Sequence, residues 1–226
     1  MKTIPHVPKE KTIHEILLKE LVLHNTCQKC LLFSETENTC IFRVCPYAKQ
    51  RTLDQNITVL EFIPFLVFET KNILLKKRLI ELYKLIKGGS VKSMFRNELH
   101  KKAFNKQIDK YTKHGYTLSN RFIASLFVLT ANSFLWNLCK RHIKPNAIDF
   151  SKIDVKGIKT DSYLLFKTAK DLYYKQHNVS VAELADKSIT RDYILTIIVN
   201  GFLIARYGYK TLELELRPKE CDCENK

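Results

Sequence analysis

A run of 18 uncharged residues, from Phe122 to Cys139, limits the folds open to this 226-residue chain more than any other feature. Its length is at the lower edge for a membrane-spanning helix. The run also contains hydroxyl and amide side chains, such as Ser125 and Asn132, which are costly when they face lipid without hydrogen-bond partners. We therefore expect residues 120–142 to form the buried central helix of a helical bundle, with Ser119 as its cap, and not a membrane span.

A helical wheel of this segment separates apolar from polar residues. The apolar side holds Phe127, Ala131, Phe134, Leu135 and Leu138, and the polar side holds Ser125, Asn132, Ser133 and Asn137. The wheel predicts that the first group is buried and the second lies away from the core.

Helical spacing of apolar residues also recurs through most of the chain, and Gly and Pro are sparse, at six each. The predicted helices are 12–24, 72–87, 91–113, 161–174, 180–187 and 190–207, with Asp161 and Ser180 as N-terminal caps and Gly88 and Gly208 as stops. Residues 59–68 fit either an edge strand or a helix with Pro64 in its first turn. Residues 212–216 alternate like a strand.

The fold class expected from these patterns is mainly α. It is a helical bundle with a small N-terminal metal-binding segment of four cysteines and room for one or two short strands. Three regions are predicted: an N-terminal helix and Cys-rich segment over 1–50, a basic helical region over 51–117, and a C-terminal helical core with an acidic tail over 118–226.

Four cysteines, Cys27, Cys30, Cys40 and Cys45, follow the pattern C-x2-C-x9-C-x4-C. A two-residue gap lets two thiolates face one centre, and the second pair completes a tetrahedral set, so we expect a structural zinc ion with no open coordination position. His24 is an alternative ligand. An iron–sulfur cluster is the alternative cofactor, because proline follows Cys45.

The chain carries a net charge of +15, and most of this excess is concentrated in one stretch. Between Lys71 and Lys113 there are 13 Lys or Arg and three acids, and 13 − 3 = +10. Interleaved aromatic residues and a high positive charge are typical of proteins that contact phosphates and unpaired bases. The candidate binding residues are Lys76, Lys77, Arg78, Lys84, Lys92, Arg96, Lys101, Lys102, Lys106, Lys110 and Lys113. A solvated lysine-rich surface without a partner is the alternative interpretation.

Motifs for nucleotide binding, zinc proteolysis and serine hydrolysis are missing, and no histidine has a carboxylate at a spacing typical of a catalytic pair. We therefore expect no catalytic residues and a non-enzymatic protein. The N-terminus lacks an apolar signal-peptide core, so the expected location is the cytoplasm. The alternatives are a small metal-dependent enzyme that acts on nucleic acid, and an iron–sulfur protein.

Residues 122–210 resemble small uncharacterised proteins of phages and integrative elements from low-GC bacteria. The resemblance rests on Phe122–Ala131, Leu135–Trp136, Ile148–Phe150, Tyr163–Tyr173 and Ile204–Gly208. It implies a mobile-element protein and carries no established activity. Together with the basic stretch, it leads us to expect a phage-type protein that engages nucleic acid, either RNA or DNA, or a nucleoprotein effector such as a CRISPR nuclease. An anti-defence role, similar to that of an anti-CRISPR inhibitor of an RNA-guided nuclease, is the expected function.

Overall fold

The computed structural model describes residues 33–34, 39–40, 57–91 and 93–212. The chain divides into two compact units, one formed by Met1–Leu53 with Lys219–Lys226 and the other by Asp54–Pro218. In the first unit, β1 (Phe33–Ser34) pairs antiparallel with β2 (Thr39–Cys40), with Phe33 opposite Cys40.

The second unit is mostly helical. Its helices are α3 (Val59–Glu69), α4 (Ile73–Lys87), α5 (Glu98–Lys113), α6 (Asn120–Thr130), α7 (Ser133–Cys139), α8 (Thr160–Tyr174), α9 (Val181–Ala185) and α10 (Asp192–Tyr207). Short 3-10 turns cover Lys140–His142, Phe150–Lys152 and Tyr209–Leu212. One antiparallel hairpin, β3 (Ile143–Lys144) with β4 (Ala147–Ile148), lies between α7 and α8.

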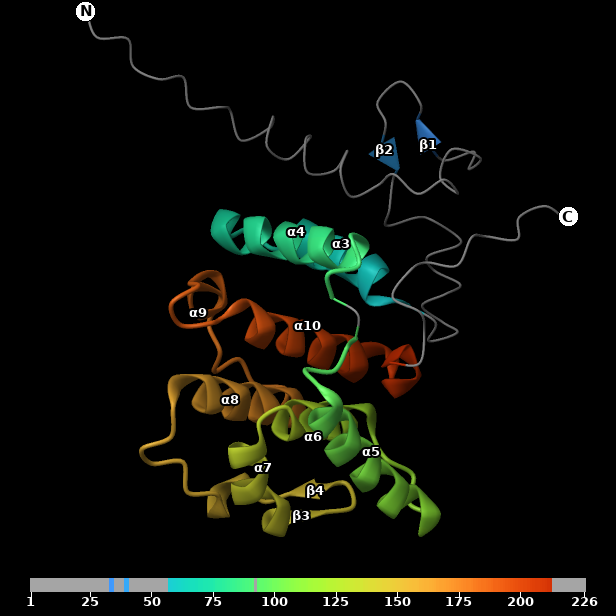
Figure 1. Cartoon of the computed structure of the whole chain (residues 1–226), viewed down its shortest axis with the longest axis vertical. Helices are drawn as coiled ribbons and strands as arrows, with labels where there is room; N and C mark the ends of the chain where they lie inside the picture. The colour runs from blue at the N-terminus through green and yellow to red at the C-terminus, as the bar shows by residue number, and fades with distance from the viewer. Residues whose placement is uncertain (1–32, 35–38, 41–56, 92, 213–226) are drawn as a thin grey trace, which may run out of the picture. The chain divides into compact units, whose positions relative to one another are not determined.

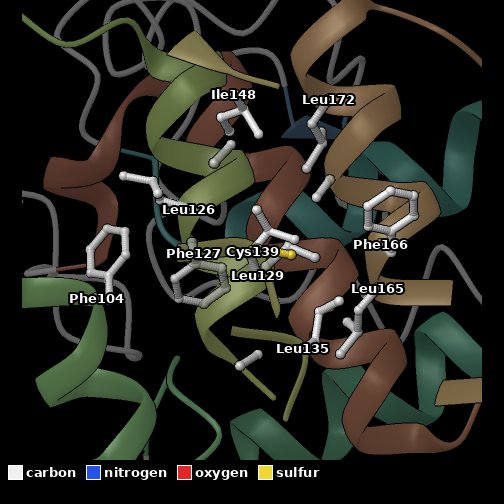
Figure 2. Packing of buried hydrophobic residues seen from close by; sticks show 14 of the residues in the cluster. Phe104, Leu126, Phe127, Leu129, Leu135, Cys139, Ile148, Leu165, Phe166 and Leu172 are labelled. Carbon is white, nitrogen blue, oxygen red and sulfur yellow. The ribbon is translucent and has the colours of Figure 1, made fainter. Parts of the chain in front are cut away.

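Helix α6 forms the centre of this unit, packed against both α8 and α10 (Figure 1). Every residue of α6 from Phe122 to Thr130 is buried. Its apolar side chains meet Phe104 from α5, Leu135 from α7, and Leu165 and Leu172 from α8 (Figure 2). Burial of this kind, at about 25 cal/mol per Å² of apolar surface, is the main source of a helical core's stability.

Close helix contact at this centre depends on one glycine of α10. A Cβ atom placed on Gly201 would lie 2.8 Å from Val128 Cγ2 and 3.1 Å from Leu172 Cδ1. Since real side chains do not approach this closely, the missing side chain is what lets α10 lie against α6 and α8.

Local capping signals set several helix boundaries as predicted. Ser119 accepts a hydrogen bond from the Phe122 amide, and Ser180 forms a reciprocal capping box with Glu183. Helix α4 ends before Gly88, and α10 ends before Gly208. Residues 59–69 form a helix, so the helical alternative for this segment is confirmed, but Pro64 is its sixth residue and does not lie in the first turn as predicted.

The prediction of one continuous helix over residues 120–142 is wrong. It divides into α6 and α7 because the Asn132 side chain accepts a hydrogen bond from the Leu135 amide and starts a new helix. The wheel also misplaced two residues. Ser125 is fully buried and donates to the backbone carbonyls of Arg121 and Ala169, whereas Phe134 is 57% exposed.

Helix α8 does not begin with the predicted Asp161 cap, and its other acidic residue, Asp171, has a structural role. Asp161 lies inside the first turn, and the N-cap position belongs to Lys159. Asp171 is buried, and its carboxylate accepts hydrogen bonds from the Asn178 side chain and the Val179 amide. It therefore fastens the loop that follows α8.

Residues from both sides of the expected boundary at 117/118 share one hydrophobic core. Phe104, Ile108 and Tyr111 belong to the same buried cluster as Phe122 and Phe127. That boundary therefore has no counterpart in the packing. In the ranges that the structure describes, no helix combines the length and apolar character needed to cross a membrane.

Candidate functional site

Helix α5 is held against the core by one apolar side. Its buried residues are His100, Phe104, Ile108 and Tyr111. The ring of Phe104 lies 5.7 Å from that of Phe127, and the ring of Tyr111 lies 5.9 Å from that of Phe122. Contacts of this kind fix the rotation of α5 about its axis, and so they determine which residues face outward.

His100 anchors the beginning of α5. Its Nδ1 accepts the Arg96 amide at 3.1 Å, and its Nε2 lies 2.8 Å from the Phe127 carbonyl oxygen. Because Nδ1 accepts, Nε2 carries the proton and the ring is neutral. The pKa of His100 is lowered from 6.5 to about 4, mainly by burial; the hydrogen bond to the Phe127 carbonyl opposes this shift, and the charge of Arg96 adds a smaller lowering.

The outward side of α5 is lined with lysine. Lys101, Lys102, Lys106, Lys110 and Lys113 are all exposed. They border an open hollow of about 520 Å³ whose remaining lining residues are Glu98, Asn105 and Asp109. Within the described ranges, none of these five lysines forms an ion pair, although Lys110 Nζ lies 5.7 Å from the Tyr111 ring centroid. We refer to these five residues as the lysine face.

The predicted basic residues of α4 belong to a different part of the surface. Lys77 and Lys84 are exposed and Lys76 is half-buried. Helix α4 contacts α3 and α9, whereas α5 contacts α6, and α10 lies between α4 and α5 in Figure 1. The basic stretch is therefore continuous in sequence but does not form one continuous face.

Arg78 is not a surface residue. Its side chain is 4% exposed, and its guanidinium donates to the carbonyls of Leu184 and Thr190 and to the Asp192 carboxylate. These bonds join α4 to α9, to the connection that follows it and to the first residue of α10. Arg78 therefore leaves the set of candidate contacts and takes a structural role.

Arg96 is exposed but partly engaged, and Lys92 lies outside the described residues. Arg96 donates to the Ala131 carbonyl at 3.2 Å, and its guanidinium carbon lies 4.6 Å from the centroid of the Tyr193 ring. This geometry is that of a cation–π stack.

Three further basic residues lie near the C-terminal end of α5 and were not predicted. The Tyr111 hydroxyl donates to the Ile143 carbonyl, and Asn146 holds the hairpin to the loop before α6 through Ser119 and Thr117. Lys140, Arg141 and Lys144 are exposed in and beside this hairpin. The uncharged run separates these three residues from α5 along the chain, so no pattern of neighbouring residues predicts that they lie near it.

Three of the four predicted metal ligands, Cys27, Cys30 and Cys45, lie outside the described residues. The fourth, Cys40, belongs to β2. In the ranges that the structure describes, no three His, Cys, Asp or Glu side chains cluster closely enough to hold a metal ion. Cys139 is a buried thiol whose pKa is raised to about 12 by burial, so it stays protonated and packs as a small apolar residue.

Comparisons with protein-family models, curated proteins and solved structures gave no match to this chain.

Proposed function

We propose that this protein is a non-enzymatic binding protein whose lysine face contacts the phosphates of a nucleic acid. The observation that carries the proposal is the set of five exposed lysines on one side of α5, none of which is neutralised by an ion pair in the described ranges. Lysine is a compact point charge, so it suits phosphate contacts that are independent of base sequence.

The dimensions of α5 fit such a contact. Sixteen residues at about 1.5 Å each give a helix about 24 Å long. Lys101, Lys106 and Lys113 distribute charge along most of this length. Because phosphates repeat regularly along a nucleic acid, a rigid row of cations can neutralise several of them together and release their counterions. Lys144 and the preceding basic turn extend the positive charge past the end of the helix.

The cellular role that we propose is that of a mobile-element accessory protein in a bacterial host. It engages free nucleic acid or the nucleic-acid part of a nucleoprotein effector such as an RNA-guided CRISPR nuclease, and it acts there as an anti-defence inhibitor. The basis for this role is the resemblance of residues 122–210 to phage-type proteins together with the lysine face.

For the N-terminal unit we propose a structural zinc ion held by Cys27, Cys30, Cys40 and Cys45. The antiparallel pairing of β1 with β2 supports this assignment, because it sets Phe33, which follows Cys30 by three residues, opposite Cys40. Zinc bound there would stabilise a segment that is too short to bury a large core of its own.

A charge-reversal experiment tests the lysine face. The test variant is Lys101→Glu, Lys102→Glu, Lys106→Glu and Lys110→Glu, which changes the net charge by eight. The matched control reverses four exposed lysines on other elements, namely Lys156, Lys159, Lys175 and Lys210, and changes the net charge equally. Binding to single-stranded and duplex RNA and DNA is measured from 50 to 300 mM salt.

We expect the test variant to lose affinity by orders of magnitude and to show a much weaker salt dependence, because each phosphate contact contributes a slope of about −0.7 to −0.9. The control should retain most of the affinity. Equal losses in the two variants would show that net charge alone drives binding and would reject the lysine face as the site.

A further inference from the structure

A second hollow, of about 500 Å³, lies between α4, the connection that leads into α5, and the beginning of α10. Its size is within the range of small-molecule binding sites. Leu82, Leu85, Val91, Met94, Leu195 and Ile197 line it with apolar groups. Phe95, Arg96 and Tyr193 bring planar groups to the same hollow.

The planar groups are held in fixed orientations. The Tyr193 hydroxyl donates to Asp161, whose carboxylate also pairs with Arg191 at 3.2 Å. Phe95 lies against the rings of His100, Phe104 and Phe127. Since these contacts restrain the rings before any ligand binds, little conformational entropy would be lost on binding.

The acidic groups at this hollow are already compensated. Glu81 pairs with Lys187 at 2.8 Å, and Asp192 pairs with the buried Arg78 at 2.8 Å. Both carboxylates remain more than half exposed, at 57% and 63%. They can therefore accept hydrogen bonds from a ligand's amino groups without presenting an uncompensated negative charge.

We infer that this hollow accepts one unpaired nucleobase of a strand whose phosphates lie on the lysine face, and this inference rests on the proposed function. Arg96 joins the two sites, because it stacks on Tyr193 in the hollow and precedes α5 by two residues. The base extends the stack formed by Arg96 and Tyr193, and its exocyclic amino group donates to Glu81 or Asp192. Bases that project from single strands are recognised by this combination of stacking and edge hydrogen bonds.

The test uses a 12-nucleotide single strand with one 2-aminopurine, whose fluorescence falls when the base stacks, and a duplex of the same sequence. Arg96→Lys keeps the charge but removes the planar group. Ser90→Trp fills the hollow from an exposed rim position. Arg206→Lys is the matched control, because Arg206 lies over Tyr207, at 5.6 Å, and does not line the hollow.

The parent and Arg206→Lys should quench the probe and prefer the single strand. Arg96→Lys and Ser90→Trp should lose the quenching and about fivefold or more in single-strand affinity, with less than a twofold change for the duplex. Salt-dependent binding through the lysine face with identical quenching in all four proteins would overturn the base site alone. Failure of the parent to bind either probe at low salt would overturn both the base site and the proposed function.

Discussion

Lowering the pH from 7.5 to 4.5 should destabilise the protein through one buried side chain, His100. This residue is 2% exposed, and its neutral ring accepts from the Arg96 amide and donates to the Phe127 carbonyl. Protonation of Nδ1 would place a second donor against the Arg96 N–H and a charge inside the core. The native state therefore resists a proton that the unfolded chain readily binds.

The size of the effect follows from the two pKa values. The unfolded chain binds a proton at His100 near pH 6.5, and the native state does so near pH 4. Between these two pKa values the unfolded state holds more protons than the native state. The contribution of neutral His100 to the unfolding free energy is therefore fully present above pH 6.5 and is lost as the pH falls toward 4. The complete loss is about 3 kcal/mol, and most of it falls between pH 7.5 and 4.5.

Urea unfolding followed by far-UV circular dichroism, at pH 7.5, 6.5, 5.5 and 4.5, measures this loss. His100→Gln is the comparison, because its amide can donate to the Phe127 carbonyl but does not titrate. Its unfolding free energy at pH 7.5 should be lower than that of the parent, yet its further loss on acidification should be about 2–3 kcal/mol smaller. The exposed His177→Gln is the control and should follow the parent. Equal pH dependence in the parent and His100→Gln would refute the reasoning.

Three other predictions test different parts of the structure. In urea titrations, Arg78→Met should lower the unfolding free energy by about 2–5 kcal/mol, because two carbonyls lose their hydrogen-bond donor. The control, Lys87→Met on the exposed side of α4, should change the unfolding free energy by less than about 0.5 kcal/mol. Gly201→Ala should lower the thermal midpoint, since overpacking typically costs about 1–3 kcal/mol, and Val128→Ala in the same chain should recover part of that loss. Cys27→Ser with Cys30→Ser should abolish zinc in elemental analysis and leave most of the helical circular dichroism signal, because every described helix lies between residues 59 and 207. A large loss of the helical signal in this double variant would instead show that the metal site is part of the helical core.

Sequence patterns were sufficient where structure depends on neighbours a few residues apart. The stripe of Leu75, Leu79, Leu82 and Ile86 predicted α4, and each of these residues is buried. Ser119 and Ser180 predicted helix starts because a capping side chain bonds to an amide only three residues ahead. Asn132 caps the start of α7 in the same way. This cap was not predicted, because the apolar residues on both sides of Asn132 continue the helical spacing and indicate one long helix.

Sequence also supplied the lysine face, but it could not separate those lysines from the other basic residues. Arg78 has its partners 106, 112 and 114 residues away, so nothing near it in the chain marks it as buried. Ile143, the residue before Lys144, accepts a hydrogen bond from Tyr111 at the end of α5, and this bond spans 32 residues. The hollow at Arg96 and Tyr193 likewise requires α4, the connection into α5 and α10 to meet. Local periodicity and capping therefore determined the helices, whereas the composition of each surface was decided by tertiary contacts, because the partners that bury or expose a charge lie far apart along the chain.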